Sequence, residues 1–181
     1  MPNMQLDAID RRIVAALQAD GRLSNVELAK RVGLSPSPCL RRVKRLEHER
    51  YIETYRAVLA RVRIGLGLTV FVGVKIESHA NERALAFEKA ILAMPEIVAC
   101  HMVSGEADYL LEVVVPDLQD YQRFLVGKLL ELPIVREVRS NIAIQSLKSE
   151  GALPLGHLDP PPEPRKPRNV AVARRPRRKA R

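Results

Sequence analysis

The sequence has little of several residue types, and each scarcity excludes a class of protein. Its 181 residues contain two cysteines, Cys39 and Cys100, too few for the disulfide framework of a small secreted domain. No group of His and Cys has the spacing of a zinc site, so we expect no metal and no other cofactor. No apolar run reaches the roughly 18–20 residues of a membrane span, and no secretory signal is present. We therefore expect a cytoplasmic protein without a membrane partner.

The net charge of +9 is distributed unevenly along the chain. Residues 1–60 carry 11 Lys and Arg against 7 Asp and Glu, residues 61–149 carry 10 against 11, and residues 150–181 carry 9 against 3. Clustered cations favour contact with a polyanion such as nucleic acid. We therefore expect such contacts from the first and last segments, and not from the nearly neutral middle.

Helix-capping signals divide the first segment into three short helices. Three pairs of residues carry this signal: Asp7 with Asp10, Ser24 with Glu27, and Ser35 with Pro36. The turn at residues 33–35, between the second and third helices, is short and contains glycine, as in a helix-turn-helix. The β-rich stretch 51–59 predicts a wing strand. We therefore expect a winged helix-turn-helix DNA-binding domain over residues 1–60, followed by a hinge over residues 61–67.

The middle segment alternates between strand and helix patterns. Apolar periodicity and turn residues predict strands at 68–76, 97–103, 109–115 and 135–147, and helices at 82–93 and after Asp117. The order β-α-β-β-α-β is that of the ferredoxin-like fold, so we expect such a domain over residues 68–149 and an α+β fold class overall. Seven prolines and many cations follow Gly151, so residues 150–181 are predicted to be a disordered tail.

The third helix of the first segment has the pattern of a DNA recognition helix. Winding residues 36–50 at 100° per residue predicts Leu40, Val43 and Leu46 on its buried side. The predicted DNA contacts lie on the opposite face and its flanks: Ser37, Pro38, Arg41, Arg42, Lys44 and Arg45.

Each cation on this helix has a distinct predicted role. Arg41 is the main candidate for bidentate reading of a guanine, and Arg45 is a second candidate. Arg42 and Lys44 are predicted to contact phosphates. The alternative is that these cations only form a solvent-exposed helix face and contact no DNA, with Glu47 and Glu49 offsetting their charge.

Several segments resemble the Lrp/AsnC, or feast/famine, family of transcriptional regulators. The similarity lies in residues 6–10, 17–22, 32–43, 103–111 and 115–117, and it extends over roughly residues 4–149. It is closer to the leucine-responsive branch than to the asparagine-responsive one. The resemblance implies homodimers that assemble into octamers, with C-terminal sheets that pair across the dimer. It also implies double-stranded DNA as a partner and control of amino-acid metabolism genes by an amino-acid effector.

The same resemblance implies an effector site in clefts between the C-terminal domains of neighbouring dimers. The family's Gly-x-x-Asp loop corresponds to Gly105 and Asp108, followed by Tyr109, and its small hydroxyl residue corresponds to Ser140. Met102 and Ile142 are further candidates, for the pocket that takes the effector side chain. Asp108 could hold the ammonium group, and Ser140 or loop N–H groups could hold the carboxylate. The alternative for the loop is a hairpin with a turn glycine and a capping aspartate.

The sequence departs from the family pattern in three places. Arg50 replaces a glycine common after the recognition helix, and Ala107 replaces a bulky loop residue. The basic tail lies outside the pattern, and its cations are expected to raise affinity for any DNA. That tail also favours an alternative function, an effector-independent architectural protein of the nucleoid.

An enzyme is a further alternative, because decarboxylases of a haem precursor share the two-domain architecture. His101 is the only histidine in the predicted core of the second domain, and no acid and base are paired there. We therefore expect no enzymatic activity.

Overall fold

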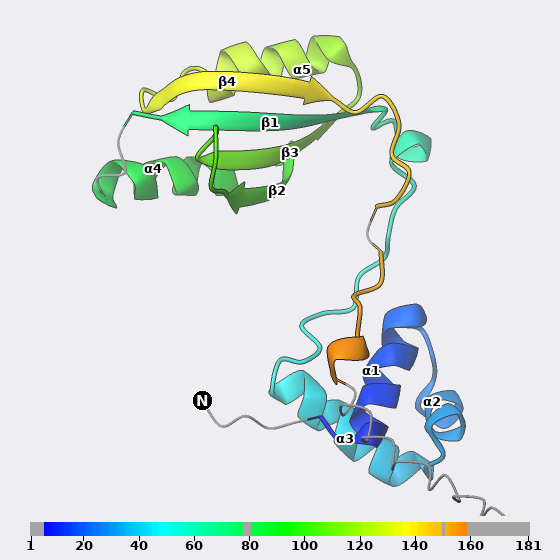
Figure 1. Cartoon of the computed structure of the whole chain (residues 1–181). Coiled ribbons are helices and arrows are strands. Elements are labelled where there is room, and N and C mark those ends of the chain that lie inside the picture. Colours follow the sequence, from blue (N-terminus) through cyan, green and yellow to red (C-terminus); the bar gives the residue numbers. More distant parts are fainter. Residues whose placement is uncertain (1–5, 78–80, 150, 159–181) are drawn as a thin grey trace, which may run out of the picture. The chain divides into compact units, whose positions relative to one another are not determined.

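The chain forms two compact units. The computed structural model describes residues 6–77, 81–149 and 151–158. One unit, here called the helical unit, combines the described residues before Arg56 with residues 152–158. The other, the sheet unit, spans Arg56–Gly151. The polypeptide therefore passes from the helical unit to the sheet unit and then returns (Figure 1).

The helical unit contains three helices: α1 (Ala8–Ala19), α2 (Asn25–Val32) and α3 (Pro36–His48). The predicted capping boxes at Asp7 and Ser24 are both present, and each satisfies N–H groups that a helix start leaves unpaired. Gly33 ends α2 with φ of 74°, a left-handed conformation that glycine adopts without steric cost. Ser35 precedes α3 as predicted, although its side chain makes no capping hydrogen bond.

The inward face of α3 differs from the predicted one. Cys39 and Leu46 are fully buried, Val43 is half-buried, and Leu40 is 43% exposed. The prediction of a buried Leu40 is therefore wrong. The helix is rotated so that Arg42, and not Leu40, turns toward α1, where the side chain meets two carboxylates.

The predicted wing strand at 51–59 does not form, so the helix-turn-helix is not winged in the described residues. Arg50 adopts a left-handed φ of 59°, and the N–H groups of Tyr51 and Ile52 bond the carbonyl of Leu46. No strand lies among the described residues of the helical unit, so the β-forming side chains have no ladder to join there. The predicted hinge contains a short 3₁₀ helix, η1 (Arg61–Ile64).

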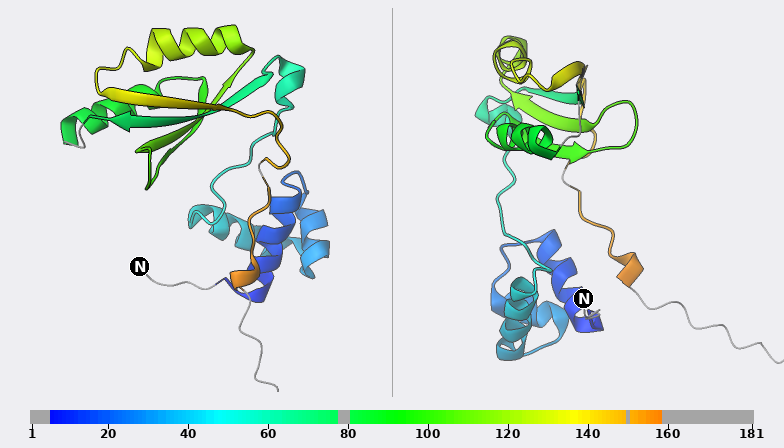
Figure 2. Two further views of the ribbon diagram at one scale, coloured as in Figure 1. Left: turned by 45° about the horizontal axis from the view of Figure 1, so that its top comes forward. Right: turned by 90° about the vertical axis from the view of Figure 1, so that its left-hand side faces the viewer.

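The sheet unit contains four antiparallel strands in the order β2-β3-β1-β4. The strands are β1 (Leu68–Ile76), β2 (Ile97–Met102), β3 (Tyr109–Val115) and β4 (Val135–Ile142). The helices are α4 (Asn81–Leu92) and α5 (Leu118–Phe124), which continues as the π-helical turn η2 (Leu125–Leu129). Both helices lie on the same face of the sheet (Figure 2). This arrangement confirms the ferredoxin-like prediction, with the last strand five residues shorter than expected.

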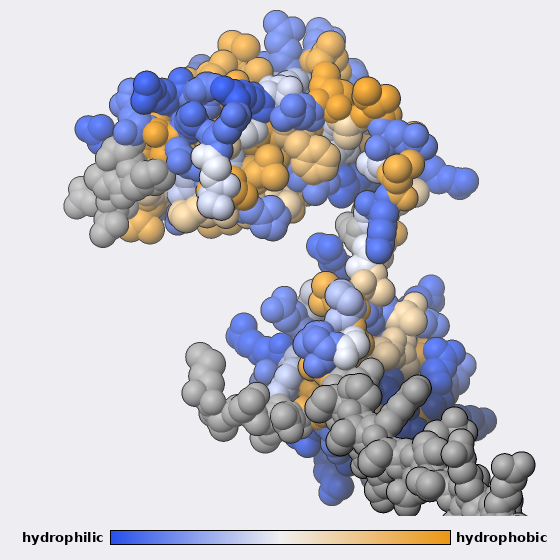
Figure 3. Space-filling model, viewed as in Figure 1, coloured by the Kyte–Doolittle hydropathy of each residue, from blue (hydrophilic) through white to orange (hydrophobic). Residues whose placement is uncertain are grey.

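The core of the sheet unit lies between the helices and one face of the sheet. Alternate residues of β1 and β3 are buried there against Phe87, Phe124 and Leu129. Leu118, at the start of α5, is 61% exposed, whereas Phe124 near its end is buried in the core. The opposite face is not covered by a helix, and Phe71 on it is 39% exposed. Apolar residues appear over the surface of this unit in Figure 3.

Part of the predicted disordered tail has a defined structure. Residues 152–158 lie along α1 and include the 3₁₀ helix η3 (Gly156–Leu158). Gln18 Nε2 donates to the carbonyl of Leu153 at 3.0 Å, and an Arg11 guanidinium nitrogen donates to that of Leu158 at 2.6 Å. The prediction of disorder is therefore wrong for this part, because α1 supplies donors for its carbonyls. Residues 159–181 lie outside the described residues.

Candidate functional site

A row of exposed residues runs along α3. Ser37, Arg41 and Lys44 are all exposed, and their spacing of four and then three residues places them on one side of the helix. Pro38 lies beside this row and is half-buried. The row presents two cations and a hydroxyl, the groups that bind phosphates and base edges.

The other two predicted DNA contacts are engaged inside the helical unit. Arg42 lies 2.6 Å from an Asp7 carboxylate oxygen and 2.8 Å from one of Asp10. Arg45 lies 2.5 Å from the second oxygen of Asp10. Asp10 is only 1% exposed, and a buried carboxylate is costly unless cations and hydrogen bonds compensate it. Arg42 and Arg45 therefore join α3 to α1.

The ion pairs change the acid–base properties of their members. The N–H of Asp10 donates to the Asp7 carboxylate and is the main cause that lowers the pKa of Asp7 to about 2, with Arg42 adding to the effect. Hydrogen bonds to Asp7 and Asp10 raise the pKa of Arg42. The signal for this cluster was present in the sequence: the two aspartates and the two arginines have the same three-residue spacing on their helices.

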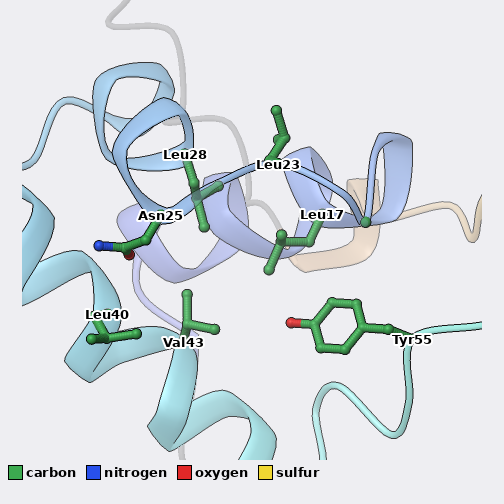
Figure 4. A pocket seen from close by; sticks show the side chains of 8 residues that line it. Leu17, Leu23, Asn25, Leu28, Leu40, Val43 and Tyr55 are labelled. Atoms are coloured by element: carbon green, nitrogen blue, oxygen red, sulfur yellow. The ribbon is translucent and has the colours of Figure 1, made fainter.

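Asn25 fixes the start of α3 against α2, a role that the sequence analysis missed. Its Nδ2 donates to the carbonyl of Pro36 at 2.9 Å. Beside it lies a hollow of about 150 Å³. Figure 4 shows Leu40 and Val43 of α3 on one side of this hollow and Leu17 and Leu28 on the other. The half-exposed Leu40 therefore borders both the hollow and the exposed row.

The loop between β2 and β3 contains the first predicted effector residues. Gly105 has φ of 135°, which disfavours any other residue there. Asp108 Oδ2 accepts a hydrogen bond from the backbone N–H of Ile76 at 2.9 Å, and Asp108 N–H donates to Val74 at 3.0 Å. Asp108 thus holds the end of β1.

The hydroxyl groups of Tyr109 and Ser140 have partners within the sheet unit. Tyr109 is 2% exposed, and its hydroxyl donates to Glu88 at 3.2 Å. Burial, with that carboxylate as a second cause, raises the pKa of Tyr109. Ser140 Oγ lies 2.5 Å from the hydroxyl of Tyr121 on α5. Ser140 therefore faces the helix side of β4.

The six predicted effector residues do not converge within one chain. Met102 lies on β2 and Ile142 on β4, which are the two edge strands, so β3 and β1 separate them. Both are exposed, at 68% and 49%. An ion pair of Glu106 with Arg139 connects the loop to β4.

Two classes of site are not seen in the described part of the chain. No three His, Cys, Asp or Glu residues there are grouped so that they could bind a metal ion. The helices there are also too short or too polar to cross a membrane.

Two family models match the chain, one for each unit. The AsnC-type helix-turn-helix domain matches residues 6–47, and the Lrp/AsnC ligand binding domain matches residues 69–153. The leucine-responsive regulatory proteins of Klebsiella pneumoniae and Salmonella typhimurium are each 44% identical over 152 residues. Each match covers 84% of this chain and 93% of the relative.

Solved structures agree with these matches. A transcriptional regulator from Neisseria meningitidis in complex with L-Met aligns with a TM-score of 0.81 and 38% identity, over 85% of this chain and 99% of that one. An AsnC family regulator from Agrobacterium tumefaciens aligns with a TM-score of 0.79 and 37% identity, over 83% and 98%. The helix-turn-helix, the ferredoxin-like unit and their order in the sequence are therefore shared, and the chain belongs to the Lrp/AsnC family of transcriptional regulators.

Proposed function

We propose that the chain reads DNA with the exposed row of α3 and adjusts this binding in response to an apolar amino acid. The proposal that α3 reads DNA rests on a difference among the cations of this helix. Arg42 and Arg45 are bound to Asp10, whereas no acidic group of the described residues pairs with Arg41 or Lys44. In the major groove, Arg41 reads a guanine through O6 and N7, and Lys44 contacts a phosphate.

Substitution of Arg41 tests this assignment. We expect Arg41→Ala to weaken binding to a cognate site by about 1–3 kcal/mol and to leave binding to random DNA nearly unchanged. Lys44→Ala serves as the matched control, because loss of a phosphate contact weakens binding to all sequences alike. Equal losses on cognate and random DNA for Arg41→Ala would refute its role in base recognition.

The proposed effector is an amino acid with an apolar side chain, such as leucine or methionine. Relatives of this chain are named leucine-responsive, and a structural neighbour is a complex with L-Met. The Gly105 loop and Ser140 would contribute to a cleft that a neighbouring chain completes, since Met102 and Ile142 lie on opposite edge strands of one chain. Asp108, whose carboxylate accepts a hydrogen bond from Ile76, is the candidate partner of the ammonium group.

A thermal-shift screen of the full chain against the twenty amino acids tests the effector. A ligand at 100 times its dissociation constant adds about 2.7 kcal/mol of stability. We expect leucine or methionine to raise the melting temperature and Asp108→Asn to reduce that rise. If no amino acid changes the melting temperature or the DNA affinity, the effector role fails.

We further propose that the open face of the sheet, which carries Phe71, pairs across a homodimer and that dimers assemble into octamers. Analytical ultracentrifugation measures both steps, and a monomer at micromolar concentration would contradict them.

The proposed place of action is the nucleoid in the cytoplasm, without catalysis. The basic tail supports a second candidate, an architectural protein without an effector. Footprinting separates the two, because uniform coverage favours the architectural protein and short phased sites favour the regulator.

A further inference from the structure

Leu40 is a large apolar side chain on the outside of α3. It is 43% exposed, whereas Cys39 and Leu46 are fully buried and Val43 is half-buried. Among the described residues of this helix, no other large apolar side chain is exposed. A single exposed leucine is common on protein surfaces, so its neighbours decide whether it has a function.

The neighbours of Leu40 on the outside of α3 are the residues of the exposed row. Leu40 follows Ser37 by three positions and precedes Lys44 by four, so it lies on the same side of the helix as both. Arg41 is the next residue along the chain. At a rise of 1.5 Å per residue, Ser37 and Lys44 are about 10 Å apart along the helix axis, with Leu40 between them. The row therefore has an apolar patch in its middle, next to a hydroxyl and two cations.

Packing inside the helical unit does not account for a leucine at this position. Behind Leu40 lies the hollow of about 150 Å³, which Leu28, Val43 and Tyr55 also line (Figure 4). Protein interiors are normally close-packed, and a void leaves the atoms that line it without contacts on one side. Leu40 therefore gains less from packing than a core leucine does, while much of its apolar surface stays in water. A ligand that covers this surface would remove it from water at a gain in free energy.

One group in the major groove of DNA matches such an apolar patch. The C5 methyl of thymine is the apolar group that base pairs present there, and apolar side chains contact it. Leu40 lies within the first two turns of α3, and the N-terminal residues of a recognition helix are those that reach base edges. The next residue, Arg41, is the proposed reader of a guanine, so both side chains are placed to meet bases.

We propose that Leu40 is a specificity-determining residue that contacts the C5 methyl of a thymine in the same half-site as the guanine read by Arg41. This inference rests on the proposed function of α3 and adds a second base to the sequence that the helix reads. The contact buries one methyl group, which is worth about fourfold in affinity. Cytosine has no methyl at this position, so the contact favours A·T over G·C there.

Replacement of thymine by deoxyuridine in the DNA tests the contact without altering the protein. Deoxyuridine lacks the C5 methyl and keeps the O4 acceptor of thymine. The probe is a duplex that the full chain selects from a random pool, with each thymine then replaced in turn. We expect affinity to fall about fourfold at one thymine of each half-site. A selected site that requires no thymine, or affinity that no replacement lowers, would overturn the proposal.

Variants of the protein assign the contact to Leu40. We expect Leu40→Ala to bind the thymine and deoxyuridine duplexes equally, because alanine is too short to reach the methyl. Leu40→Met keeps a long apolar side chain and should keep most of the fourfold difference. Each ratio compares two duplexes on one protein, so a loss of stability does not mimic the result.

Val43→Ala is the matched control for these variants. It removes apolar atoms from another wall of the same hollow and leaves the exposed row and Leu40 in place. We therefore expect Val43→Ala to keep the fourfold difference between the two duplexes. A fourfold difference that persists in Leu40→Ala, or one that is lost in Val43→Ala, would overturn the assignment to Leu40.

The outcomes separate this proposal from the proposed function. If Arg41→Ala loses sequence preference while deoxyuridine has no effect, α3 reads DNA and the Leu40 contact does not exist. If deoxyuridine weakens binding only when Leu40 is present while Arg41→Ala has no selective effect, the guanine-reading role of Arg41 fails instead. If neither change has a selective effect, both proposals for α3 fail.

Discussion

Two neighbouring arginines on α3 have opposite roles, although both are long cations on the same helix. Arg41 is exposed, whereas Arg42 shares hydrogen bonds between Asp7 and the buried Asp10. The difference arises because one position on α3 lies against α1 and the next does not. A substitution at either position removes one guanidinium, so the two variants form a matched pair.

We expect Arg42→Ala to lower the free energy of unfolding of the helical unit by about 2–3 kcal/mol, because a buried carboxylate loses a charged donor. Arg41→Ala should change that free energy by less than about 0.5 kcal/mol. Thermal unfolding followed by circular dichroism measures both. Equal stability of the two variants would show that the Asp10 cluster does not hold the helices together.

Asp7 should make the stability of the helical unit sensitive to acid. Its pKa falls from 3.8 to about 2 on folding, so the folded state binds the proton less well than the unfolded chain. The resulting stabilisation is fully present above about pH 4 and is lost as the pH falls toward 2. Unfolding experiments between these pH values should show a smaller loss of the free energy of unfolding for Asp7→Asn than for the native chain. The same pH dependence in both proteins would contradict this contribution of Asp7.

At the scale of elements, the end of α3 depends on an unusual backbone conformation. Arg50 is not a glycine, and it nevertheless adopts φ of 59°. The left-handed conformation costs roughly 1–2 kcal/mol for a residue with a Cβ. The bonds from Tyr51 and Ile52 to Leu46 depend on this turn.

Arg50→Gly should therefore stabilise the helical unit by about 1 kcal/mol, and Arg50→Ala should not, because alanine keeps the Cβ. Chemical denaturation measures the difference between the two variants. A similar stability for both would mean that the turn relaxes without strain.

At the scale of the whole molecule, pairing of two chains would present two copies of α3 to one duplex. Two-fold related helices meet successive major grooves about 34–36 Å apart, or about 10–10.5 base pairs. Insertion of about five base pairs between half-sites should weaken binding strongly, and insertion of a full turn should restore much of it. Electrophoretic mobility shifts on such a spacing series measure this. Affinity independent of spacing would favour the architectural alternative.

The sequence by itself determined the three helices of the helical unit and the succession of strands and helices along the chain in the sheet unit. Their signals are local: caps such as Asp7 and Ser24 satisfy backbone groups within a few residues, and alternating apolar residues in β1 need only one covered face. The Lrp/AsnC family also followed from sequence motifs in both units.

Only the tertiary structure decided which side of α3 faces inward, whether residues 51–59 form a strand, and where residues 152–158 lie. Each of these depends on a partner that is distant in the sequence. Asp10 turns Arg42 inward, the missing neighbouring strand leaves the predicted wing unpaired, and Arg11 binds a carbonyl 147 residues away. A side chain or backbone group takes the position that satisfies its charge or hydrogen bonds, and the packed fold alone brings those partners together.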